Sequence, residues 1–141
     1  MAATSSFLKL TNEGAMAALN AAMGKAADMG VPQCISIVDA GGNLLAFTRM
    51  DGAFSLSVDT SLMKAKTAAS YGGPTGHIAE GVDIKLAIAT RGQRVNLPGG
   101  LPVIVDGHVI GGIGVGSGTG AQDLEVAKVG IAAIDGAQQF E

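Results

Sequence analysis

The stretch LPVIVDGHVIGGIGVG, residues 101–116, constrains the fold of this chain more than any other. Asp106-Gly107 stands between two runs of alternating apolar residues, and an Asp-Gly pair in that setting favours the two-residue turn of a β-hairpin. The returning run is rich in glycine, and glycine inside a strand often marks a close approach by another backbone or by a ligand. The sequence therefore predicts a hairpin over these residues, with a returning strand that the glycines weaken.

A second hairpin is predicted upstream, in CISIVDAGGNLLAFTRM, residues 34–50. Two apolar runs there flank the turn residues Asp39–Asn43. Hairpins bring antiparallel strands side by side. With a few extended residues expected at 94–96, we predict an antiparallel sheet of about five strands.

Helices are predicted before and after the first hairpin. Residues 11–29 carry apolar side chains at three- and four-residue spacing, with Thr11 as N-cap and Gly30 as C-cap. A second helix is expected over 57–71, with Ser57 as its cap.

Two further helical segments are expected later in the chain. A short helix within 77–90 is weakened by Gly81. The last helix is expected over about 120–139, because Thr119-Gly120-Ala121-Gln122 has the pattern of a capping box.

The expected order is helix, hairpin, helix, a weaker helix, hairpin and helix. Of the 141 residues 48% are hydrophobic, enough to fill one core, and the absence of Trp means that Val, Ile, Leu, Ala and Met build it. The fold class is therefore α/β (α+β), an antiparallel sheet flanked by helices, in a single domain over 1–141.

Charge and hydropathy exclude several classes of function. The formal net charge is −3 and the nine basic residues form no run, so no nucleic-acid partner is expected. No apolar stretch reaches the ~20 residues that span a bilayer, so no membrane partner is expected. Residues 1–10 lack the pattern of a secretory signal, and we expect a cytoplasmic protein. The single Cys34 is expected to be a small core residue.

The segment Gly116–Ala121 fits the relaxed dinucleotide-binding pattern G-x-G-x-x-A. That fingerprint needs a further parallel strand and an acidic residue about 20 residues on. Asp135 is expected inside the last helix, so NAD binding is disfavoured. The glycine-rich start of a helix still suits a carboxylate or phosphate group, although an ordinary helix cap explains it as well.

A few polar side chains are candidates for chemistry. Arg49 and Asp51 follow a strand, where they form either a surface ion pair or a clamp at a pocket mouth. Lys64 is either solvated or drawn into a pocket as an amine with a lowered pKa. His77 lies in a loop that can fold over a site, with Glu80 three residues on.

Other polar residues have simpler explanations. His108 follows the Asp106-Gly107 turn and is expected at the hairpin tip, although either histidine is able to ligate a metal or haem iron. Asp123 suits the positive end of the last helix, and Gln122 closes its capping box. No second ligand stands at metal-site spacing, so no metal site is predicted.

Four motifs in order resemble the GlcG/HbpS family, whose members include the haem-binding HbpS-type proteins and the C-terminal domain of PduO-type proteins. They are VDAGGNLLAFTRMDGA (38–53), SLMKAKTAAS (61–70), PGGLPVIVDGHVIGGIGV (98–115) and SGTGAQDLEVAKVGIAAI (117–134). The resemblance covers nearly the whole chain. It implies a profilin-like domain and homo-oligomers, from dimers to octamers.

For function the resemblance implies haem binding, a link to corrinoid pathways, or a place in the catabolism of small organic acids and aromatic compounds. The motif positions carried over, which we infer to line one pocket, are Arg49, Asp51, Lys64, Gly99, Gly100, Gln122 and Asp123.

Two hypotheses follow. In the first, the chain binds haem, another tetrapyrrole or a small carboxylated metabolite in a pocket near Arg49, Lys64 and the start of the last helix. In the second, it is a cofactor-independent enzyme of the hydrolase, hydratase or tautomerase type. Lys64 or His77 would then move protons on a carbonyl or imine substrate, with Asp51 or Asp123 as partner.

Overall fold

The computed structural model describes residues 2–141 and contains one four-stranded sheet within them. Strands β1 (Cys34–Asp39), β2 (Leu44–Arg49), β3 (Gly100–Val105) and β4 (His108–Gly116) lie in the order β2-β1-β4-β3, and every neighbouring pair is antiparallel. Both predicted hairpins are confirmed.

The expected number of about five strands is corrected to four in the described residues. Residues 94–96 do not join the sheet. The backbone N–H of Val95 donates instead to the Thr67 hydroxyl, at 2.9 Å, which ties this segment to a helix.

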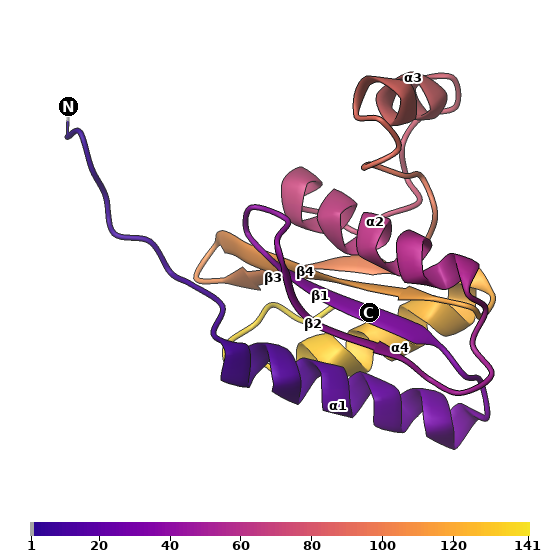
Figure 1. Cartoon of the computed structure of the whole chain (residues 1–141). Coiled ribbons are helices and arrows are strands. Elements are labelled where there is room, and N and C mark those ends of the chain that lie inside the picture. The colour runs from indigo at the N-terminus through magenta and orange to yellow at the C-terminus, as the bar shows by residue number, and fades with distance from the viewer. Residues whose placement is uncertain (1) are drawn as a thin grey trace.

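Helices cover both faces of the sheet (Figure 1). Helix α2 (Leu56–Tyr71) packs on one face, across β1, β3 and β4. Helices α1 (Asn12–Met29) and α4 (Gly120–Ala132) pack against each other and on the opposite face. The mixed α/β class with a helix-flanked antiparallel sheet is therefore confirmed.

Helix α3 (Val82–Ala89) stands apart from the sheet, beyond α2 (Figure 1). None of its residues is buried, although it carries several apolar side chains. No helix in the described part of the chain is both long and apolar enough to cross a membrane.

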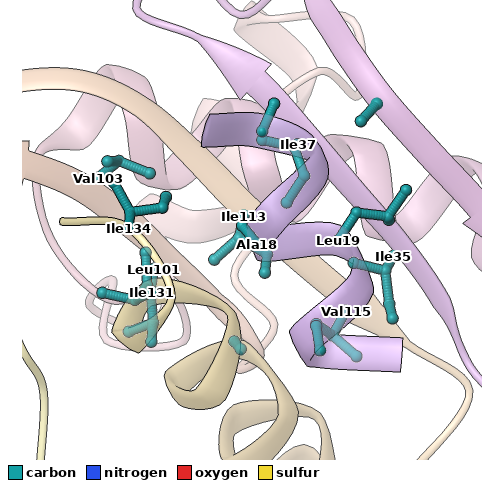
Figure 2. Packing of buried hydrophobic residues seen from close by; sticks show 14 of the residues in the cluster. Ala18, Leu19, Ile35, Ile37, Leu101, Val103, Ile113, Val115, Ile131 and Ile134 are labelled. Carbon is teal, nitrogen blue, oxygen red and sulfur yellow. The ribbon is translucent and has the colours of Figure 1, made fainter. Parts of the chain in front are cut away.

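The main apolar core lies between the sheet and the α1/α4 layer (Figure 2). Aliphatic side chains from the strands meet alanines and leucines of the two helices there, and Ile35, Ile113 and Ile131 are fully buried. This core is built almost entirely from Val, Ile, Leu and Ala, as the composition predicts.

The opposite face brings the backbone of α2 directly onto β4. A Cβ atom at Gly112 or Gly114 would overlap the carbonyl oxygen of Ala65 or Ser61. The glycines of β4 therefore mark the close approach of a helix backbone, one of the two explanations that the sequence left open.

Both ends of α1 and the start of α4 match their sequence signals. The Thr11 hydroxyl accepts from the Gly14 N–H, and Gly30 takes the left-handed conformation with φ +69°. Thr119 and Gln122 form the predicted capping box. Such reciprocal bonds satisfy the free N–H groups of the first helical turn.

Two predicted helix boundaries were wrong. Ser55, not Ser57, precedes α2, and its side chain makes no capping bond. Helix α4 ends at Ala132 rather than near 139, because the chain turns at Gly136 (φ +77°) and the Gln138 N–H donates to Ile104 of β3. Asp135 therefore lies beyond the helix, not inside it.

Candidate functional site

The residues that the family resemblance implies to be functional lie together at one end of the sheet. Cys34 at the start of β1 pairs with Arg49 on one side and with Gly116 on the other. Helices α2 and α4 both begin beside this end. We call Arg49, Asp51, Lys64, Gly99, Gly100, Gln122 and Asp123 the sheet-end cluster.

At the centre of this cluster, Lys64 and Asp123 form a buried ion pair. The Lys64 ammonium lies 3.0 Å from Asp123 Oδ2 and 2.7 Å from the Val115 carbonyl oxygen, and donates to both. Lys64 is only 5% exposed and Asp123 only 3%. The pair joins α2 to the first turn of α4 around the end of β4.

The second oxygen of Asp123 is also bonded. Its Oδ1 accepts from Gln33 Nε2 at 2.6 Å and from the Gly118 N–H at 2.9 Å. Burial raises the pKa of Asp123, and the charge and hydrogen bond of Lys64, together with the hydrogen bond from Gly118, offset part of that rise. In the described residues, Gln33 Oε1 is buried without a hydrogen-bond partner.

Three further members of the cluster have structural roles. A Cβ atom at Gly99 would lie 2.7 Å from Asp123 Cβ, so this glycine lets the backbone close over the ion pair. A Cβ at Gly100 would lie 2.6 Å from the Lys64 carbonyl oxygen. Gln122 accepts from the Thr119 N–H in the capping box.

Arg49 and Asp51 are exposed at the rim of the cluster. The Cys34 thiol beside them is buried, as expected for a core residue. Burial raises the pKa of Cys34, while the charge of Arg49 and a hydrogen bond with Ser117 act in the opposite direction. Ser117 was not singled out from the sequence, yet its hydroxyl also accepts from the Phe54 N–H, and its φ of +92° is unusual for a non-glycine residue.

His77 lies outside the buried part of the cluster. It is exposed, on the segment that leads from α2 to α3, and its neighbour Ile78 exchanges two hydrogen bonds with the Asn96 side chain. A Cβ at Gly76 would meet Pro98, and so would one at Gly120. His77 therefore follows a segment that touches the start of α4.

Three hollows lie away from the sheet-end cluster. An open groove of about 390 Å³ lies at the other end of the molecule, between the N-terminal segment, the start of α1, the β3–β4 hairpin and the chain after α4. We call it the N-terminal groove. Its lining is Leu8, Lys9, Leu10, Thr11, Glu13, Gly14, Ala17, Val105, Ile110, Ala133, Ile134 and Asp135.

Two smaller hollows accompany it. One of about 160 Å³ shares Lys9, Leu10 and Ile110 with the N-terminal groove, so the two adjoin. The other, of about 270 Å³, lies beside α3, where Ile84, Val95 and Leu97 line it. No member of the sheet-end cluster lines any of these three hollows. Within residues 2–141, no three His, Cys, Asp or Glu side chains gather as a metal site would require.

These features define a small α/β protein in which an antiparallel sheet lies between two helical layers and a buried lysine–aspartate pair closes one end. The family model described as haem-degrading protein HbpS-like matches residues 10–132. The chain therefore belongs to the HbpS-like family, and the resemblance to the GlcG/HbpS family is confirmed.

Known proteins agree with this assignment. An uncharacterised 15.0 kDa protein from the dhaT–dhaS intergenic region of Citrobacter freundii is 42% identical over 112 residues, covering 76% of this chain and 79% of that protein. The crystal structure of Klebsiella pneumoniae ORFY has a TM-score of 0.90 at 33% identity, covering 98% of this chain and 99% of that one. A crystal structure of a PduOC–haem complex has a TM-score of 0.86 at 29% identity, covering 95% of this chain and all of that one (100%).

Proposed function

We propose that this protein binds haem or a related tetrapyrrole. The observation that carries the proposal is the N-terminal groove, whose volume of about 390 Å³ lies within the ~300–1,000 Å³ of small-molecule sites. Its apolar lining, which includes Leu10, Ile110 and Ile134, suits the rings of a porphyrin. The sheet-end cluster is closely packed by comparison, since its ion pair is covered by Gly99.

One side chain of the groove lining suits the charged part of haem. Lys9 is exposed on the lining, and among residues 2–141 no ion pair engages it, so it is available to a propionate. The two histidines, His77 and His108, are both exposed and offer nitrogen ligands, although neither is among the residues that line the groove. Haem, when bound, supplies an iron that accepts such an axial ligand and undergoes one-electron chemistry.

Relatives support the same ligand class. The family is described by haem degradation, and the haem complex of PduOC shares the fold along nearly all of this chain. The similarity supports a tetrapyrrole rather than an unspecified apolar ligand.

A haemin titration tests the proposal, with serum albumin as the control for nonspecific uptake. We expect the Soret band to shift and saturate at one haemin per chain. A weak change that rises without saturation would contradict the proposal.

A small carboxylated metabolite at the sheet-end cluster is the second candidate. It is favoured because α2 and α4 begin at the end of the sheet where β2 ends in Arg49, and helix N-termini and a guanidinium all attract an anion. Arg49, Gly99, Gly100, Gln122 and Asp123 are the proposed binding residues. Calorimetric titration with small oxo-acids is expected to give binding that Arg49→Ala removes and Arg91→Ala, at a distant exposed arginine, leaves intact.

The same cluster supports an enzymatic version of this candidate. An amine and a carboxyl held 3.0 Å apart inside the protein are able to exchange a proton with a carbonyl or imine substrate. Lys64, Asp51 and His77 are the proposed catalytic residues. Turnover of an aldehyde or oxo-acid, followed by NMR, should then disappear in Lys64→Met and in His77→Ala, whereas His108→Ala should retain it.

We also propose that the chain forms a homo-oligomer. Val82, Ile84 and Ile88 of α3 are 54%, 65% and 74% exposed, and exposed apolar side chains of a helix gain stability when a second copy covers them. Sedimentation of Ile84→Asp/Ile88→Asp against the unaltered protein tests this, and an unchanged mass would contradict it.

A further inference from the structure

The two edges of the sheet differ in what covers them. Strand β3 forms one edge, and much of its outward-facing backbone is already bonded. The Gly100 N–H donates to the Thr75 hydroxyl, and the Gly100 carbonyl oxygen accepts from the Thr75 N–H. The Ile104 carbonyl oxygen accepts from the Gln138 N–H, and Pro102 has no N–H to offer. A further strand therefore has little to pair with on this side.

Strand β2 forms the other edge, and its outward backbone groups are open. The Met50 N–H donates to the Gln33 carbonyl oxygen, so these two residues form a hydrogen-bonded pair. Hydrogen-bonded and non-hydrogen-bonded pairs alternate along an antiparallel ladder. The N–H and C=O groups of Phe47 and Arg49 therefore point away from β1, and within residues 2–141 no strand lies beyond them.

The α2 face of this edge carries exposed apolar side chains. Phe47 pairs with Ser36, whose hydroxyl bonds to Ser61 of α2, so Phe47 projects on the α2 face. Leu44 and Phe47 are 52% and 36% exposed. Residues 44–49 include no proline or lysine, which often protect edge strands. An open edge of this composition favours pairing with another strand.

The opposite face of the same edge is bordered by methionines of α1. Thr48 alternates to that face, and its hydroxyl lies 3.9 Å from Met23 Sδ. Met16 lies about two helical turns before Met23, on the same side of α1, and is exposed. Apolar side chains therefore flank the open edge on both faces of the sheet.

We propose that β2 pairs with β2 of a second copy of this chain about a two-fold axis, so that two sheets join into one. Antiparallel strands related by such an axis offer each other the same groups, so one open edge closes the other. The outer edges of the joined sheet are then two β3 strands, which are already covered. Association through this edge therefore stops at a dimer. It uses neither the N-terminal groove nor α3, so it stands independently of both proposals made for them.

A bulge in β2 sets the register of this pairing. The pairing of β1 with β2 shifts at Leu45, which is an extra residue on β2 and ends the regular edge. The register that uses the open groups of both copies places Phe47 opposite Arg49 of the second copy, with Thr48 on the axis. The guanidinium then lies beside the ring, a favourable contact. A register with Arg49 opposite Arg49 would set like charges together.

Sedimentation of the full chain tests the pairing, with Phe47→Lys as the disrupting variant. The new lysine would stand opposite Arg49 of the second copy, and lysine on an edge strand disfavours strand pairing. Phe54→Lys is the matched control, because Phe54 is also an exposed phenylalanine but lies outside β2. We expect Phe47→Lys to weaken self-association roughly tenfold or more, and Phe54→Lys to change it less than about twofold.

Both variants are compared in the Ile84→Asp/Ile88→Asp background, so that the contact proposed for α3 does not contribute. There we expect a dimer that Phe47→Lys converts to a monomer. A dimer that persists with Phe47→Lys would overturn the inference, and so would an equal effect of Phe54→Lys. A monomer already in the Ile84→Asp/Ile88→Asp background would overturn it too, while supporting the α3 contact.

Amide hydrogen exchange in the unaltered protein gives a second measurement that needs no substitution. We expect the Phe47 and Arg49 N–H groups to exchange slowly in the associated protein and faster on dilution. The Ile35 N–H, which points into the β1–β2 ladder, is the internal control and should exchange slowly at every concentration. Fast exchange of Phe47 and Arg49 in the associated protein would show that this edge stays open, and the pairing would be wrong.

Discussion

The two faces of the sheet are packed on different principles. On the α1/α4 face, large aliphatic side chains such as Ile35 and Ile113 interdigitate with the helices (Figure 2). On the α2 face, β4 has no side chain at Gly112 and Gly114, where the backbone of α2 comes close. Polar groups are also buried on this face, and the hydroxyls of Ser36 and Ser61 are hydrogen-bonded to each other at 2.8 Å. The first face depends on apolar area, and the second on backbone fit and paired polar groups.

The comparison indicates which parts of this protein are least tolerant of substitution. An aliphatic layer tolerates small changes of shape, because neighbouring side chains adjust. A layer in which backbone meets backbone has no side chain to move, and a buried polar group that loses its partner keeps its full desolvation cost. We therefore expect the α2 face and the sheet-end ion pair to be the less tolerant parts.

The largest effect is expected from Gly114→Ala. The added Cβ would overlap the Ser61 carbonyl oxygen and crowd the Ala65 nitrogen, both in the backbone of α2. We expect the free energy of unfolding to fall by an amount at or beyond the upper end of the ~1–3 kcal/mol that is typical of overpacking. Thermal unfolding followed by circular dichroism measures it.

Gly24→Ala is the matched control for this change. A Cβ at Gly24 of α1 meets nothing within 4 Å, and alanine stabilises a helix interior by about 0.5–1 kcal/mol relative to glycine. Equal unfolding temperatures for the two variants would show that α2 does not depend on a bare backbone at Gly114.

An effect of comparable size is expected from Lys64→Met. It leaves the Asp123 carboxylate buried without its cation, which typically costs about 3–5 kcal/mol. Lys128→Met removes a lysine from a more exposed pair with Glu125 and should cost less than about 1 kcal/mol. Urea unfolding of both variants makes the comparison.

The cost of Lys64→Met should also depend on pH. Burial raises the pKa of Asp123 in the folded protein, and removal of Lys64 removes the main opposing influence. An acid whose pKa is higher in the folded than in the unfolded state loses stability as pH rises through that interval. The deficit of Lys64→Met should therefore be smaller near pH 4 than at pH 7. A deficit independent of pH would mean that Asp123 is not the group left unpaired.

Local signals made most of the fold predictable. The Asp106-Gly107 turn, the Thr119–Gln122 capping box and the Gly30 cap each act over a few residues, and each is present in the structure. The end of α4 was missed because it is fixed by a contact with β3, not by a local stop signal. The fifth strand was wrongly expected because the local sequence of residues 94–96 indicates an extended backbone. This segment bonds to α2 and not to the sheet, a contact that no local signal shows.

The candidate site was less predictable, because its partners are far apart in the sequence. Lys64 and Asp123 are separated by 59 residues, and Gln33 and Asp123 by 90. The family motifs indicated the residues, but no spacing indicated that Lys64 would be buried against Asp123.

The smallest effect is expected from Ile131→Val, on the aliphatic face. Ile131 is fully buried in the α1/α4 core, and removal of one methylene from such a site costs about 0.5–1.5 kcal/mol. Its counterpart is Ala65→Val, which adds two methyl groups where α2 meets Gly112 and Gly114 and should cost more, about 1–3 kcal/mol. Urea unfolding of the two variants compares a lost methylene with a gained volume. If Ile131→Val proved the more damaging, aliphatic packing would be the stricter of the two principles, and the α2 face would owe its glycines to something other than close contact.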